Sequence, residues 1–142
     1  MNEQSYETVF FYGLFMDESL LEGKGIHVSG SRVAVLEGYK LRIGRRATLV
    51  RDPTARSFGV VSRVARQDVE LLYSHESVAD YVAEPVCVTL PDGTTEAAVC
   101  YNLPAEKLEG TNPEYAHALL QLACKLGFPD EYLEEIKRFA KR

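Results

Sequence analysis

The order of strand and helix patterns constrains the fold of this chain more than any other feature. Up to residue 102 the apolar positions run together or alternate with polar ones, and from residue 113 they recur at helical spacing. Short helical patterns follow the first strand at 17–22 and interrupt the later ones at 66–73. We therefore predict an α+β fold whose mixed or antiparallel sheet is able to close into a small barrel. The predicted strands cover residues 8–12, 33–36, 39–43, 47–50, 57–64, 81–90 and 94–101, with a loop at 52–54.

The last third of the chain predicts two helices. Asn112 can cap the first helix, Pro113 suits its first turn, and Gly127 ends it. Pro129 and Asp130 begin the second helix. Each helix has one apolar stripe, which favours packing on the rest of the domain over binding of a partner. The stripes are Ala116, Leu119, Leu120, Ala123 and Leu126 in the first helix, and Tyr132, Leu133, Ile136, Phe139 and Ala140 in the second.

Length, charge and cysteine usage exclude several classes of protein. The 142 residues fit a single domain over 1–142, and the net charge of -5 argues against nucleic-acid binding, which usually requires a basic face. No apolar run approaches the roughly 18 residues of a membrane helix, and the polar, acidic start is unlike a signal peptide. Cys87, Cys100 and Cys124 are odd in number and lack CxxC spacing. We therefore expect reduced thiols, a cytoplasmic location, and neither a disulfide framework nor a zinc site.

The stretch 9–17 is the first candidate for a functional site. An apolar run breaks at Gly13 and leads into a short helical pattern. Such a junction presents backbone N–H groups near a helix start, where they can hold a carboxylate or an oxyanion. One hypothesis is a substrate cradle, and the alternative is a core strand followed by a tight turn.

Glu76 is the candidate for chemistry. It follows the helical pattern 66–73 and precedes the strand pattern 81–90, with Tyr73 and Tyr81 nearby in sequence. A carboxylate partly buried there would have a raised pKa and could act as a general base near neutral pH. The alternative is an exposed loop glutamate, since glutamate is mostly a surface residue.

Other polar residues give weaker signals. The pair Arg45-Arg46 could clamp a carboxylate, although such a pair is more often a solvated turn. The three histidines lack HxxxH and HExxH spacing, so we expect no metal site.

The combination of Tyr12-Gly13-Leu14-Phe15 after the first strand with Glu76-Ser77-Val78 before a later one resembles the γ-glutamylcyclotransferase family. That family includes the γ-glutamylamine cyclotransferases and AIG2-like proteins, and the resemblance covers most of residues 8–102. It implies a small mixed β-barrel flanked by helices. The two C-terminal helices look like an addition to it.

The resemblance also implies an intramolecular reaction on a small γ-glutamyl substrate, with no metal and no cofactor. The α-amine of the γ-glutamyl group attacks its own γ-carbonyl and releases 5-oxoproline and an amine or amino acid. By the same resemblance, Glu76 is the base and later acid, backbone N–H groups of Tyr12, Gly13, Leu14 and Phe15 hold the glutamyl part, and Tyr101 is a pocket residue.

Two departures from the family pattern leave three hypotheses open. Leu14 stands where the family usually has Ser or Thr, and Ser77 stands where it usually has Gly. The first hypothesis is a cyclotransferase, the second a binding or regulatory module without turnover, and the third a lyase-like or acyl-transfer enzyme acting on a related amide. The sequence does not define the leaving group, the oligomeric state or the pathway.

Overall fold

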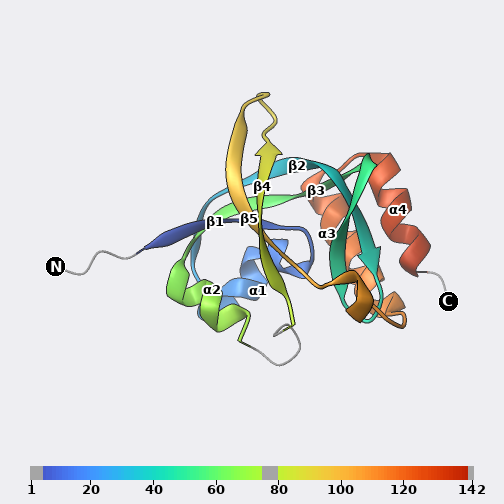
Figure 1. The fold of residues 1–142 in the computed structure, drawn as a ribbon, viewed down its shortest axis with the longest axis horizontal. Helices are drawn as coiled ribbons and strands as arrows, with labels where there is room; N and C mark the ends of the chain where they lie inside the picture. The colour runs from blue at the N-terminus through green and yellow to red at the C-terminus, as the bar shows by residue number, and fades with distance from the viewer. Residues whose placement is uncertain (1–4, 75–79, 141–142) are drawn as a thin grey trace.

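The computed structural model describes residues 5–74 and 80–140. Within this part of the chain, five strands close into a barrel in the order β1-β3-β2-β4-β5 (Figure 1). β1 pairs with β5 in parallel at Val9 and Val99, and the other neighbouring strands are antiparallel. The predicted α+β fold with a small mixed barrel is confirmed. The strands are β1 (Tyr6–Phe11), β2 (Val28–Ile43), β3 (Ala47–Ala65), β4 (Val82–Thr89) and β5 (Thr95–Asn102).

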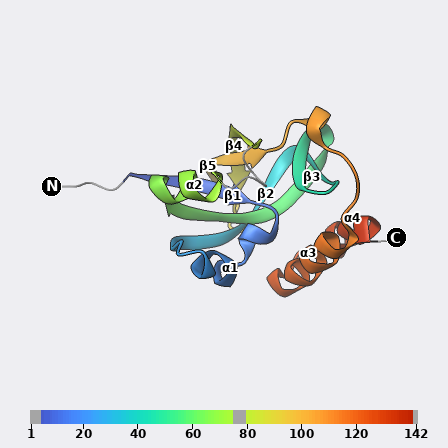
Figure 2. The ribbon, with the colours of Figure 1, turned by 90° about the horizontal axis from the view of Figure 1, so that it is seen from below.

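The helices gather at two ends of the barrel. Figures 1 and 2 show α3 and α4 side by side next to the β2–β3 hairpin, whereas α1 and α2 lie toward the other end. No helix of residues 5–74 and 80–140 has the length and apolar character needed to cross a membrane. The helices are α1 (Glu18–Gly23), α2 (Arg66–Leu72), α3 (Pro113–Leu126) and α4 (Asp130–Ala140), with short 3-10 turns η1 (Leu14–Met16) and η3 (Ala105–Lys107).

The predicted loop at 52–54 is wrong, because in the structure these residues belong to β3 of the β2–β3 hairpin. β3 runs through this segment, and the register shifts there: Tyr39 pairs with Arg51, but Glu37 pairs with Arg56. The extra residues of β3 are accommodated opposite Gly38, whose φ of 83° is a conformation that favours glycine. The local turn signal therefore produces a bulge within a long strand, because pairing with β2 continues on both sides.

The two C-terminal helices pack through their predicted stripes. Ala116, Leu119 and Ala123 of α3 are fully buried. Tyr132 of α4 has its ring centroid 5.0 Å from that of Phe58 on β3. Aromatic contacts of this kind add to the burial of apolar area, so the helices are part of the main core.

Candidate functional site

A cavity of about 360 Å³ lies where the end of β1 and the turn η1 meet α3. The turn between β2 and β3, Tyr101 of β5, and residues in or next to α1 and α2 also line it. This volume is within the range of small-molecule sites. All five residues predicted to bind substrate line it, namely Tyr12, Gly13, Leu14, Phe15 and Tyr101.

Position 13 requires a glycine because a side chain has no room there, and not because of the backbone conformation. Its φ of -112° and ψ of -151° are open to residues with side chains, and the chain turns after it, in η1. A Cβ atom at this position would collide with the hydroxyl of Tyr115 on α3. The same hydroxyl accepts a hydrogen bond of 3.2 Å from the Leu14 backbone N–H. The predicted cradle is therefore closed on one side by a tyrosine from the C-terminal helix.

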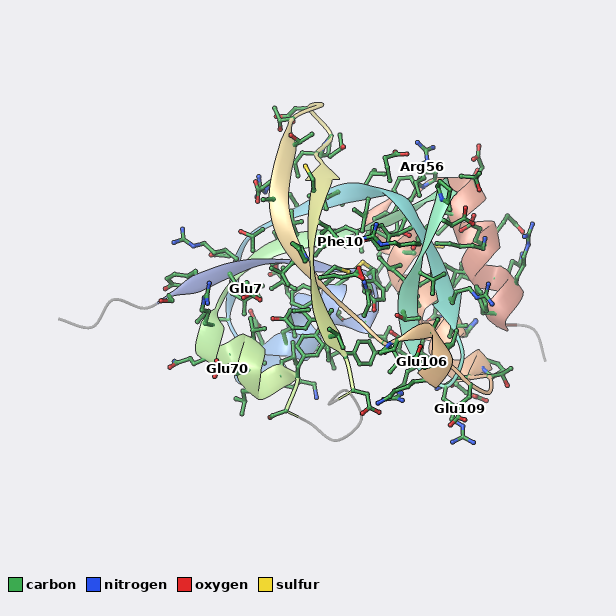
Figure 3. All side chains as sticks on the ribbon, in the orientation of Figure 1. Glu7, Phe10, Arg56, Glu70, Glu106 and Glu109 are labelled. Atoms are coloured by element: carbon green, nitrogen blue, oxygen red, sulfur yellow. The ribbon has the colours of Figure 1, made fainter. Side chains whose placement is uncertain are left out.

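Three of the cavity tyrosines donate their hydroxyl protons to other parts of the protein. Tyr12 donates to the Tyr101 carbonyl at 2.8 Å, and Tyr81 donates to the Ala47 carbonyl. Tyr101 donates to Oε1 of Glu7, labelled in Figure 3, at 2.6 Å. These bonds fix the rings, so these residues present aromatic surface to a ligand more than hydroxyl groups.

Ring contacts connect the loop to the opposite wall. Phe15 meets Phe11 and Tyr73 edge to face, with centroids 6.2 and 5.9 Å apart. Tyr73 stacks on Tyr101 with a centroid distance of 4.2 Å. The four rings form a continuous aromatic wall from η1 to β5, which suits the apolar part of a small ligand.

Burial keeps the cavity tyrosines protonated. It is the largest cause of the raised pKa of Tyr12, Tyr73 and Tyr115, and it also raises the pKa of Tyr81 and Tyr101. At neutral pH these hydroxyl groups are hydrogen-bond donors and cannot act as bases. A base for substrate chemistry has to come from another residue type.

The charges at the cavity are positive. Lys24, Arg45 and Arg46 line it, and within the described ranges no aspartate or glutamate does. Arg46 is also 3.6 Å from Asp80 and lies over the ring of Tyr81 at 6.0 Å. A cavity of this kind favours a ligand with a carboxylate.

Glu76 lies outside the described residues. Tyr73 and Tyr81, which precede and follow it in the sequence, both line the cavity. Of the other glutamates, Glu70 and Glu106 are exposed (Figure 3). No cluster of three potential metal ligands occurs in the part of the chain that the structure describes.

Sequence reasoning missed Tyr115. It lies within the predicted helix that begins at Pro113, directly before the stripe residue Ala116 and four residues before Leu119. This spacing places it on the buried side of the helix. It therefore signalled contact with the barrel, but not contact with Leu14.

A family model described as "Gamma-glutamyl cyclotransferase, AIG2-like" matches residues 9–119 of the chain. The comparison with curated proteins gave no significant match. The matched residues extend into α3, so the expectation that the C-terminal helices are an addition to the family fold is wrong for at least the first of them.

Solved structures resemble the chain over nearly its whole length. A "Gamma-glutamyl cyclotransferase" has a TM-score of 0.79 at 20% identity, covering 97% of this chain and 90% of that protein. A human protein titled uncharacterized protein loc79017 has a TM-score of 0.77 at 22% identity, covering 96% and 89%. A yeast γ-glutamyl cyclotransferase specific to glutathione has a TM-score of 0.60 at 15% identity, covering 96% and 98%. These similarities establish a shared fold that includes both C-terminal helices.

Proposed function

The chain belongs to the gamma-glutamyl cyclotransferase, AIG2-like family, and from this premise we propose that it cyclises a γ-glutamyl amide or peptide to 5-oxoproline and releases an amine or amino acid. One observation carries the proposal: the loop Tyr12–Phe15 and Tyr101, which are far apart in sequence, line the same cavity. The reaction needs no second substrate, since nucleophile and electrophile belong to one molecule.

The chemical steps define what the protein must supply. A base removes a proton from the substrate α-ammonium group, and the free amine attacks the γ-carbonyl carbon. A C–N bond forms while the carbonyl π pair moves onto oxygen. The carbonyl then re-forms and the bond to the leaving nitrogen breaks. The leaving nitrogen takes up the proton held by the base and the second proton that the ring nitrogen loses, so it departs as an ammonium group. The protein contributes the base, the folded substrate conformation and donors for the oxyanion.

We assign the base to Glu76. Tyrosines with raised pKa cannot serve, and no described acidic residue lines the cavity, so the available groups support a carboxylate from outside the described ranges. Two cavity residues, Tyr73 and Tyr81, flank Glu76 in the sequence. After accepting the proton, Glu76 returns it to the leaving amine.

A cationic residue of the cavity can bind the carboxylate of the substrate. We assign the α-carboxylate of the γ-glutamyl group to Arg46, because a guanidinium binds a carboxylate through two parallel hydrogen bonds. The aromatic wall takes the methylene groups. A cytoplasmic location is part of the proposal and is supported by the free thiols of Cys87, Cys100 and Cys124.

The test is product formation. Purified protein is incubated with γ-glutamyl amines, γ-glutamyl dipeptides and glutathione, and both 5-oxoproline and released amine are measured. Glu76→Gln is expected to abolish release, and Glu70→Gln, on the exposed face of α2, is the matched control. Amine release without 5-oxoproline would favour acyl transfer over cyclisation.

A second candidate function is binding without turnover. It is favoured by Leu14, which brings no hydroxyl to the loop, and by its backbone N–H, which already donates to Tyr115. A γ-glutamyl compound that raises the melting temperature while no product forms would support this function.

A further inference from the structure

The cavity holds more cationic side chains than a γ-glutamyl group needs. Arg46, to which we assign the α-carboxylate of that group, is accompanied in the lining by Arg45 and Lys24. Within residues 5–74 and 80–140 no acidic side chain lines the cavity to balance them. A γ-glutamyl group carries one carboxylate, which one guanidinium can bind. The surplus of positive charge therefore favours a substrate with a second carboxylate, on the group that leaves.

Arg45 and Lys24 differ in how far the protein already pairs their charge. The guanidinium of Arg45 lies 3.9 Å from the Glu109 carboxylate, although both side chains are 74% exposed. The Lys24 side chain forms no ion pair and no hydrogen bond with any residue in the described ranges; its backbone N–H donates to the Leu21 carbonyl. The ammonium group of Lys24 is therefore the better candidate to bind a carboxylate of a ligand.

An apolar side chain that the core does not use accompanies Lys24. Lys24 directly follows α1, and Leu20 lies four residues before it, so the two are one helical turn apart on the same side. Leu20 is 38% exposed, whereas its neighbour Leu21 is buried in the core. A single exposed leucine is ordinary on a protein surface, but Leu20 also lines the cavity. The end of α1 thus presents one apolar and one cationic group to the same ligand.

The burial of the lining residues orients the substrate. Phe11 and Tyr12, at the loop proposed to hold the glutamyl part, are buried. Leu20 and Lys24 line the same cavity and are exposed. With its glutamyl part at the buried side, the substrate directs its leaving group toward the exposed side, where the end of α1 lies.

We propose that Lys24 and Leu20 form a leaving-group subsite that selects γ-glutamyl amino acids with an apolar side chain over γ-glutamyl amines. The Lys24 ammonium group binds the carboxylate of the leaving amino acid, and Leu20 contacts its side chain. The subsite rests on the proposed cyclisation. Neither contact changes while the C–N bond breaks, so both contribute equally to ground-state and transition-state binding. They therefore lower KM and leave kcat unchanged.

The experiment compares KM for 5-oxoproline release from γ-glutamyl-leucine and γ-glutamyl-leucinamide, in which a neutral amide replaces the carboxylate of the leaving group. The natural chain should have a KM about fivefold lower for the acid, which is the upper range for an exposed ion pair. In Lys24→Met, which keeps an apolar stem, the two KM values should differ by less than about twofold. Lys125→Met removes a charge from the last turn of α3, outside the cavity lining, and should keep the preference.

The ionic strength gives a second measure of the same contact. An exposed ion pair is screened by salt, so raising NaCl from about 20 mM to about 500 mM should reduce the preference of the natural chain for the acid to less than about twofold. The KM ratio of Lys24→Met should not respond to salt. A preference that is independent of salt in the natural chain contradicts an ion pair with Lys24.

Leu20→Ala tests the apolar half of the subsite. The natural chain should have a KM at least about threefold lower for γ-glutamyl-leucine than for γ-glutamyl-glycine, because the leucine side chain leaves water on contact with Leu20. Leu20→Ala should lose most of this difference and keep the preference for the acid. Leu71→Ala, which shortens an exposed leucine of α2 outside the cavity lining, is the matched control. An unchanged difference in Leu20→Ala contradicts the contact.

The outcomes separate the subsite from the reaction. Release of 5-oxoproline with equal KM values for acid and amide in the natural chain, or with the same ratio in Lys24→Met, contradicts the subsite and leaves the cyclisation intact. A preference lost in Arg45→Met but kept in Lys24→Met also contradicts it, since the carboxylate then binds Arg45. A natural chain that releases no 5-oxoproline from any γ-glutamyl compound contradicts the proposed function, and the subsite falls with it.

Discussion

The hydroxyl of Tyr115 occupies the space that a Cβ atom on residue 13 would need, so Gly13 and Tyr115 are a complementary pair. Gly13 lies just past the end of β1 and Tyr115 in the first turn of α3. The hydrogen bond from Leu14 to Tyr115 holds the two elements at this separation. The pair thus joins the N-terminal loop to the C-terminal helix at the wall of the cavity.

Gly13→Ala is expected to destabilise the fold by about 1–3 kcal/mol, because overpacking forces the loop or α3 to move. In Tyr115→Phe the same change should be neutral or should stabilise by up to about 1 kcal/mol, since the backbone angles at position 13 suit alanine. Urea unfolding of the four proteins measures this coupling. An equal effect of Gly13→Ala in both backgrounds would show that the hydroxyl is not the obstacle.

Removing the charge of Arg46 should weaken substrate binding. Arg46→Met keeps most of the stem and is expected to raise KM about tenfold, which corresponds to loss of one charge-assisted hydrogen bond. The free energy of unfolding should change little, because Asp80 keeps its ion pair with Lys107, at 3.4 Å. Arg51→Met, which alters an arginine over Tyr39 outside the cavity lining, is the control. If both variants have the KM of the natural chain, Arg46 does not bind the substrate carboxylate.

Asn112→Ala should affect both stability and turnover. Loss of a helix N-cap costs about 1 kcal/mol, and the variant also loses the bond to the Arg45 carbonyl. Because Asn112 accepts a hydrogen bond from the backbone N–H of Tyr115 and so positions this cavity residue, we expect kcat to fall severalfold. Asp92→Ala removes the side-chain acceptor for Thr94 in the β4–β5 turn, far from the cavity lining, and should lower stability without changing kcat. Similar kcat values for the two variants would contradict the positioning role.

Alkaline pH should unfold the protein before most cavity tyrosines ionise. Burial raises the pKa of these tyrosines above the ordinary value of 10.0. Below pH 10 both folded and unfolded states are protonated and the stabilisation is fully present. As pH rises above 10, the unfolded state loses protons that the folded state keeps, so stability falls. Tyrosinate absorbance should therefore rise together with loss of circular dichroism. Reversible ionisation of all eight tyrosines in the folded state would contradict this prediction.

Much of the fold was predictable because its signals are local. The apolar runs gave the strands around Val9 and Val61, and the stripes gave α3 and α4. The continuity of β3 through residues 52–55 was not predictable, because Asp52 and Pro53 are local turn signals and the pairing that overrides them is set by β2. Glu37-Gly38, by contrast, is a local signal for a turn or bulge, and the register shift falls there.

The candidate site was predictable where a motif marks it. Tyr12-Gly13-Leu14-Phe15 and Tyr101 line one cavity, and their binding of substrate stays a prediction. Tyr115 was not identified, because helical spacing reveals which face is buried but not which distant residue it meets. Its hydrogen bond spans 101 positions in the sequence, and the resemblance to the family covers residues 8–102, which end before α3. The role of Glu76 stays a prediction.

The measurement that tests the central claim most directly is 5-oxoproline release by the natural chain and by Glu76→Gln, assayed side by side on the same γ-glutamyl compounds. The account predicts release by the natural chain and a loss of at least about 100-fold in the variant, the contribution expected of a general base. Equal release by both proteins, or none by the natural chain, would contradict it.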